Sequence, residues 1–108
     1  MVTLRLYETA EGKCPFDEWF NVLDAKAAVK VTAALTRMEL GNFGDVKPVG
    51  QGVSERRIDF GPGYRIYFGR VGDEIVILLC GGSKKRQQKD IEAAKACWNE
   101  YKRRKKGG

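Results

Sequence analysis

The chain of 108 residues carries 20 Lys and Arg against 14 Asp and Glu, a net charge of +6, and it contains no His. Its length fits one domain. Hydrophobic residues make up 43% and charged residues 31%, the balance of a folded soluble chain rather than a disordered one. Without His, neither a Ser-His-Asp triad nor a Cys-His pair can form, so acid–base chemistry must use other side chains.

Nothing in the sequence predicts a membrane segment, a metal site or a cofactor site. The longest strongly apolar run, residues 75–80, is far shorter than the roughly 20 residues of a membrane span. The first residues lack the apolar core of a signal peptide. The three cysteines Cys14, Cys80 and Cys97 are widely spaced, which argues against a disulfide framework and a structural zinc. We therefore expect a cytoplasmic protein.

The first half of the chain predicts one strand and two helices. Residues 3–7 alternate and predict a strand. Pro15 suits the first turn of a helix, and the apolar residues that follow it recur at helical spacing up to Leu23. A second amphipathic helix is predicted from about Lys26 to Leu40, and Gly41 is a natural stop.

The second half predicts three hairpin-linked strands and a last helix. Residues 41–52 are interpreted as a glycine-rich connection, and strands are expected at 53–60, 64–71 and 75–80. The last helix begins between Gln87 and Asp90. The order β-α-α-β-β-β-α predicts an α+β fold, an antiparallel sheet packed against helices.

The positive charge gathers at the C-terminus. Residues 102–106 are five consecutive cations. Without them the chain carries 15 cations against 14 carboxylates, a net charge of +1. We expect residues 1–101 to form a single domain and residues 102–108 a basic tail. This tail is either a nucleic-acid-binding arm or the solvated end of a helix.

Period-2 alternation along the predicted strands gathers charged side chains on one face of the sheet. Glu55, Arg57, Arg65 and Tyr67 share this face, because the apolar side of each strand must face the helices. We expect the face to be exposed. A single surface arginine needs no role beyond solubility, but several converging cations and a tyrosine favour binding of phosphate or RNA.

Five segments, in order and with compatible spacing, resemble motifs of one toxin family. The resemblance covers most of residues 5–100. The segments are Cys14–Trp19 ("PFxEW"), residues 41–47 ("GNxGDxK"), 50–58 ("GxGVxELRI"), 61–68 ("GPGYRVYF") and 78–91 ("LLxGGxKxxQxxDI"). The chain is therefore similar to the addiction-module killer proteins, a HigB-like branch of the RelE/ParE toxin superfamily, whose fold has the same order of elements.

The resemblance implies a toxin of a type II toxin–antitoxin system. Relatives of RelE and HigB cleave mRNA on the translating ribosome, and a cognate antitoxin, in this branch a small helix-turn-helix protein, holds them inactive. The implied activity is a metal-independent endoribonuclease that uses the RNA 2′-hydroxyl as nucleophile. Two alternatives remain open: a ParE-like toxin that inhibits gyrase, and an inactive remnant that only binds its antitoxin.

The resemblance also implies roles for individual residues. Arg65 would stabilise the transition-state phosphate, Arg57 would share this role or clamp the substrate, and Lys84 would protonate the leaving group or pair with phosphate. The base stays open between a lysine and the carboxylates Glu55 and Asp45. Glu55 replaces a lysine of RelE, and Asp90 lies near the position of RelE's C-terminal-helix tyrosine. The expected RNA-binding residues are Lys47, Tyr67, Lys85, Arg86 and Gln87.

Overall fold

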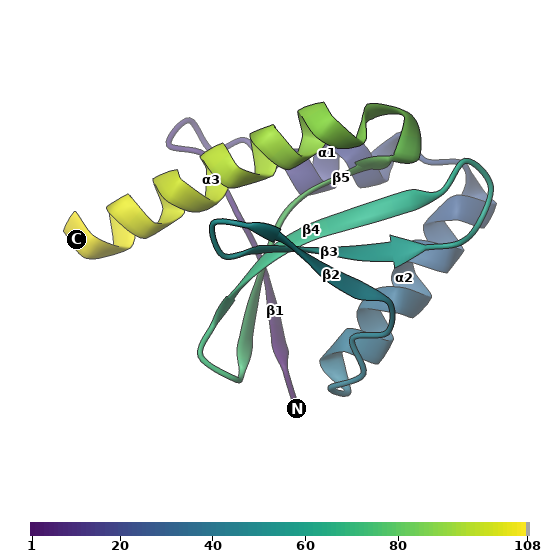
Figure 1. Ribbon diagram of the computed structural model, residues 1–108, viewed down its shortest axis with the longest axis horizontal. Coiled ribbons are helices and arrows are strands. Elements are labelled where there is room, and N and C mark those ends of the chain that lie inside the picture. Colours follow the sequence, from purple (N-terminus) through teal and green to yellow (C-terminus); the bar gives the residue numbers. More distant parts are fainter. Residues whose placement is uncertain (108) are drawn as a thin grey trace.

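The computed structural model describes residues 1–107, a five-stranded sheet with helices on both faces (Figure 1). This confirms the predicted α+β class. In chain order the elements are β1 (Thr3–Leu6), α1 (Pro15–Asn21), α2 (Ala25–Glu39), β2 (Val46–Gly50), β3 (Val53–Ile58), β4 (Tyr64–Val71), β5 (Ile75–Ser83), the 3-10 helix η1 (Lys84–Arg86) and α3 (Gln87–Gly107).

The strands lie in the order β1-β5-β4-β3-β2. Strands β2 to β5 form an antiparallel meander, and β1 adds to the outer side of β5 in parallel. The sheet is thus mixed rather than wholly antiparallel. β5 lies inside the sheet, which explains why its sequence is apolar on both faces.

Strand β2 corrects the interpretation of residues 41–52 as a connection only. It lies at the edge of the sheet and contains Pro48, a residue that edge strands tolerate. Positive φ angles at Gly50, Gln51 and Gly52 turn the chain into β3. The glycine content that hid the strand therefore belongs to its tight turn.

Each face of the sheet has its own apolar core. On one face α1 and α2 contribute Phe16, Val31 and Met38, which pack with Ile66 and Phe68 of β4. On the other face α3 packs over β4 and β5. The core residues on this face are Tyr7, Val53, Tyr67, Ile77, Leu79, Cys80, Ala94 and Trp98. Both faces of the sheet are therefore covered by helices, as Figure 1 shows.

Two glycines allow β5 to continue past its predicted end at Cys80. A Cβ atom at Gly81 would lie 2.1 Å from Cε3 of the Trp19 ring, so a helix residue fills the space that a side chain would take. We expect Gly81→Ala to lower the free energy of unfolding by about 1–3 kcal/mol through overpacking. Denaturant unfolding of this variant, of Trp19→Leu and of the double variant tests this. If the two changes are additive, the close contact is not the cause.

Helix α3 is the longest element. Its 21 residues correspond to about 30 Å of helix, and its yellow C-terminal half extends past the edge of the sheet in Figure 1. Lys102 to Lys106 form the last turns of this helix. Among the described residues, no helix combines the length and apolar character needed to cross a membrane.

Candidate functional site

The register of the sheet places two arginines side by side. Arg57 of β3 pairs with Arg65 of β4, and Arg65 pairs with Gly82 of β5. Directly opposed side chains share a face of the sheet and have Cβ atoms about 5 Å apart. Arg65 is only 9% exposed, whereas Arg57 is partly exposed. The sequence-based placement of these two residues on one face is confirmed.

A carboxylate accompanies each arginine and offsets the repulsion between the two guanidinium groups. Arg57 Nη2 lies 2.8 Å from Asp45 Oδ1 in an ion pair whose two side chains are open to solvent. The hydrogen bond from the Arg57 guanidinium lowers the pKa of Asp45 and raises the pKa of Arg57 itself. Arg65 Nε lies 3.4 Å from Glu55 Oε1, in a pair that is almost completely buried.

Glu55 is the centre of a buried polar network. It has no exposed surface, and its Oε1 accepts hydrogen bonds from the Tyr67 hydroxyl at 3.2 Å and from Gln87 Nε2 at 2.8 Å. Its Oε2 is buried without a hydrogen-bond partner. Burial and the neighbouring Glu55 carboxylate raise the pKa of Tyr67. The network fixes the carboxylate that faces Arg65.

The expectation that this face of the sheet is exposed is wrong. Helix α3 packs over it, so Glu55 and Tyr67 are fully buried and Arg65 nearly so. The Tyr67 ring presents no free surface on which a base could stack. Near this network the face reaches solvent at its end, at Arg57 and the start of η1.

Lys84 follows β5 directly and lies close to Arg65. The amide of Lys84 donates to the carbonyl of Gly63 at 2.8 Å. A Cβ atom at Gly63 would lie 3.5 Å from Lys84 Cβ and 3.7 Å from Arg65 Nη1, and the backbone there has φ +81°. Gly63 therefore brings the lysine stem and the guanidinium group together. Lys84, Lys85 and Arg86 are all exposed on η1.

Asp90 joins this site, although the sequence had not placed it among the site residues. It lies in the first turn of α3, and a Cβ atom at Gly82 would lie 1.9 Å from its Oδ2. Burial raises the pKa of this carboxyl group, and Arg86 opposes that shift. The signal in the sequence was the glycine pair of β5, which leaves room for a side chain of α3 beside Arg65.

A groove of about 600 Å³ extends from this network to the edge of the sheet. It lies between β2 and the start of α3, and its lining residues include Lys47, Val49, Glu55, Gln87 and Ile91. Lys47 pairs with Glu55 across β2 and β3, so it flanks the buried network. The structure thus brings Lys47 and Gln87 together in this groove. Asp45 and Arg57 lie two residues along the chain from Lys47 and Glu55, respectively.

The raised pKa of Asp90 predicts a pH dependence of stability. The folded protein binds the proton of this carboxyl more tightly than the unfolded chain, whose pKa is about 3.9. This contribution is complete below the unfolded value and is lost as pH rises through the folded pKa. We expect wild type to lose stability relative to Asp90→Asn between pH 4 and neutrality. Urea unfolding across this range tests it, and parallel curves would contradict it.

The fold and the site define a small α+β protein with a cluster of cationic side chains at one end of its sheet. A family model of phage-derived Gp49-like proteins (DUF891) matches residues 18–101. The chain therefore belongs to this family, a toxin-like family of addiction modules. It is also 48% identical, over 81 residues, to an uncharacterized protein of Haemophilus influenzae, an alignment that covers 74% of this chain and 82% of the relative.

Proposed function

We propose that the protein is the toxin of a type II toxin–antitoxin system and acts as a ribosome-dependent mRNA endoribonuclease. The observation that carries this proposal is the cluster of Arg57, Arg65 and Lys84, in which Arg65 is held by a buried carboxylate before any substrate binds. Cations fixed in advance around a reacting phosphate are usually the largest contribution to this type of catalysis.

The proposed reaction is a transesterification without a metal ion. The 2′-oxygen of the RNA attacks the adjacent phosphorus while the bond from phosphorus to the 5′-oxygen breaks, which leaves a 2′,3′-cyclic phosphate and a 5′-hydroxyl. A base takes the proton of the 2′-hydroxyl, and an acid returns a proton to the 5′-oxygen. Arg65 and Arg57 stabilise the charge on the phosphate oxygens, and a guanidinium fork suits two of them at once.

The surroundings of the three carboxylates separate their roles. Glu55 is buried, accepts hydrogen bonds from two side chains and forms an ion pair with Arg65, so it positions Arg65 and is not accessible to a ribose hydroxyl. The ion pair with Arg57 lowers the pKa of Asp45 and makes it a weak base. Asp90, whose pKa is raised, is the better acid–base candidate, and Lys84 is the candidate for protonating the leaving group.

Basic residues around the cluster are proposed to hold the RNA. Lys47, Lys85 and Arg86 are exposed beside the groove or on η1, where they can contact phosphates. The Gln87 amide bonds Glu55, so its role is positional as much as RNA-binding. The proposed partners are the ribosome, its mRNA and an antitoxin protein of the helix-turn-helix type, and the proposed compartment is the cytoplasm.

Brief induction of the toxin in growing cells tests the proposal. Messenger RNA 5′ ends and DNA breaks are mapped in parallel for wild type and Arg65→Ala. New mRNA ends within translated frames, absent from the variant, are expected. Arrest with DNA breaks and intact mRNA would instead identify a gyrase inhibitor, and a protein that causes neither arrest nor cleavage would be an inactive antitoxin-binding remnant.

A further inference from the structure

A basic and aromatic stripe runs along the C-terminal half of α3, far from the Arg65 cluster. Trp98, Tyr101, Lys102, Lys105 and Lys106 follow one another at helical spacing. The rings of Trp98 and Tyr101 stack with centroids 5.4 Å apart and planes 8° from parallel. Lys102 lies over the Trp98 ring and Lys105 over the Tyr101 ring, each at 5.7 Å. The lysines are thus arranged around an aromatic surface.

This stripe forms one wall of a groove of about 550 Å³. The opposite wall is the α3-facing side of the sheet, where Arg5 of β1 lies beside Val71 and Ile75 of the β4–β5 hairpin. No carboxylate lines the groove among the residues that the structure describes. Within the same residues, none of Arg5, Lys102, Lys105 and Lys106 forms an ion pair.

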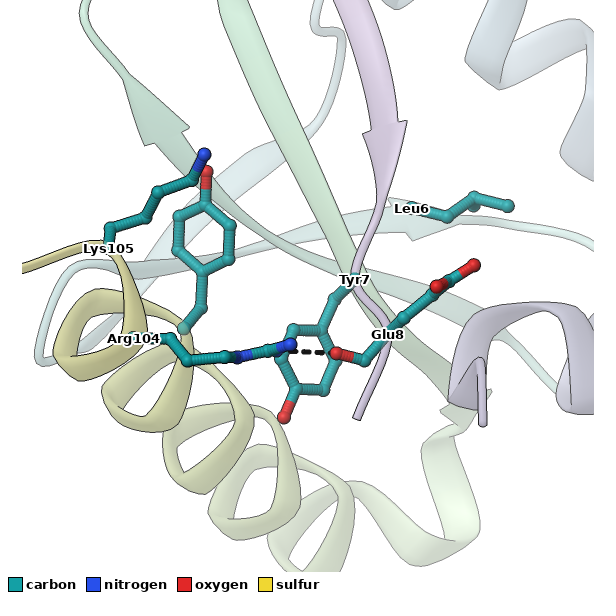
Figure 2. Close-up of a pocket in the computed structure, with 6 residues that line it drawn as sticks. Leu6, Tyr7, Glu8, Arg104 and Lys105 are labelled. Carbon is teal, nitrogen blue, oxygen red and sulfur yellow. Dashed lines mark hydrogen bonds between the residues drawn. The ribbon is translucent and has the colours of Figure 1, made fainter. Parts of the chain in front are cut away.

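The other side of the same helix is different, as Figure 2 shows. There Arg104 donates to the backbone carbonyl of Glu8 at 2.5 Å and to the Glu100 carboxylate at 2.8 Å, and its guanidinium lies over the Tyr7 ring. The Tyr7 hydroxyl donates to Glu100 at 2.5 Å. This side fastens α3 to the chain after β1 with compensated charges. Lys102 and Lys106, which have no ion pair within the described part of the chain, line only the groove side, and Lys105 borders both sides.

Uncompensated cations on one stripe cost stability, because like charges three and four residues apart repel each other. The helix dipole favours cations only in the last turn, which leaves Lys102 and Arg5 unexplained. A ligand with several negative charges would relieve the repulsion. The partly exposed Tyr101 ring adds a stacking and cation–π contact that suits nucleic acid better than a carboxylate-rich peptide.

We propose that this groove is a second binding site for RNA, which holds the phosphate backbone outside the cleavage site. From Gln87 to Lys106 the helix advances about 28 Å, so a strand held at both ends of α3 would be fixed across the site by two separate contacts. The inference rests on the proposed function for the identity of the polyanion, but it does not require cleavage.

The test measures binding of a fluorescein-labelled 20-nucleotide oligouridylate over a range of salt concentrations. All proteins carry Arg65→Ala, so that no RNA is cut. The test variant adds Lys102→Gln, Lys105→Gln and Lys106→Gln, and the matched control adds Lys13→Gln, Lys26→Gln and Lys30→Gln, exposed lysines elsewhere on the molecule. Thermal unfolding of each protein verifies that it is folded.

We expect the slope of log affinity against log salt to fall by about 2 in the test variant, because each phosphate contact on a single strand contributes about 0.7. The control should retain the parent slope. Equal slopes for test and control variants would overturn the proposal. Binding of labelled poly-glutamate is measured in parallel. A test variant that loses binding to poly-glutamate but not to the oligouridylate would also overturn the proposal, since that result identifies an acidic protein as the occupant.

Failure of the proposed function gives a different pattern. If the wild-type protein cuts no mRNA but the salt slope still falls in the test variant, the groove binds RNA and the nuclease mechanism is wrong. If cleavage occurs and the slopes do not differ, the catalytic site is correct and the second binding site is not.

Discussion

Replacing Arg65 with Ala is expected to reduce mRNA cleavage on translating ribosomes by at least about 10²-fold. In the proposed mechanism Arg65, which Glu55 holds in place, is a donor fixed in advance beside the reacting phosphate, and loss of one such donor typically costs 10²–10³-fold in rate. Arg65→Lys should recover only part of the activity, because an ammonium group cannot bind two phosphate oxygens in the planar manner of a guanidinium. Cleavage rates on purified ribosomes, measured by primer extension, test both variants.

Arg37→Ala is the matched control for this prediction. Arg37 is an exposed arginine near the end of α2 on the opposite face of the sheet, so its removal changes the net charge equally without touching the site. We expect the control to cleave at the wild-type rate. An Arg65→Ala protein that cleaves as fast as the control would remove Arg65 from the mechanism.

The second large effect is expected at Glu55, and it is an effect on stability. Removing one partner of a buried ion pair leaves an uncompensated charge, which costs about 3–5 kcal/mol. Glu55→Ala should therefore lower the free energy of unfolding by about 3 kcal/mol or more, and it should release the side chains of Arg65, Tyr67 and Gln87. Urea unfolding measures the loss. Glu55→Gln, which keeps an acceptor oxygen in place, should be less destabilised than the alanine variant.

Asp45→Ala provides the comparison, since it removes the carboxylate of the neighbouring arginine. The pair of Asp45 and Arg57 is open to solvent, and exposed ion pairs contribute little to stability. We expect the stability of this variant to match wild type within error. If Glu55→Ala and Asp45→Ala lower the free energy of unfolding by similar amounts, the burial of the Arg65–Glu55 pair is not the reason for its contribution to stability.

Sequence periodicity predicted which residues share the charged face of the sheet but not that this face is buried. The alternation of β3 and β4 placed Glu55, Arg57, Arg65 and Tyr67 together, and the register confirms this. The prediction placed all helices, α3 included, on the apolar face, because a charged strand face resembles a solvent-exposed one. The polar side chains pair with one another beneath the helix. Alternation along a strand predicts which side chains share a face, but not whether they pair with one another and become buried.

Two further differences have the same origin, in contacts that only the folded chain creates. Strand β2 has little intrinsic strand character, and it forms because β3 offers a partner at the edge of the sheet. The sequence marked Asp90 only as a departure from RelE's tyrosine, since an acidic residue in the first turn of a helix ordinarily serves the helix dipole. Its position over Gly82 follows from how α3 folds back onto β5.

The central claim is that this protein cuts mRNA with a cationic cluster at one end of its sheet. The most direct measurement incubates purified protein with translating ribosomes and one defined mRNA, in the absence of divalent-metal cofactors beyond those of the ribosome, and then analyses the RNA ends. The account predicts cuts within the reading frame that leave 2′,3′-cyclic phosphate and 5′-hydroxyl ends and that Arg65→Ala abolishes. Intact mRNA on ribosomes that carry the bound wild-type protein would contradict it.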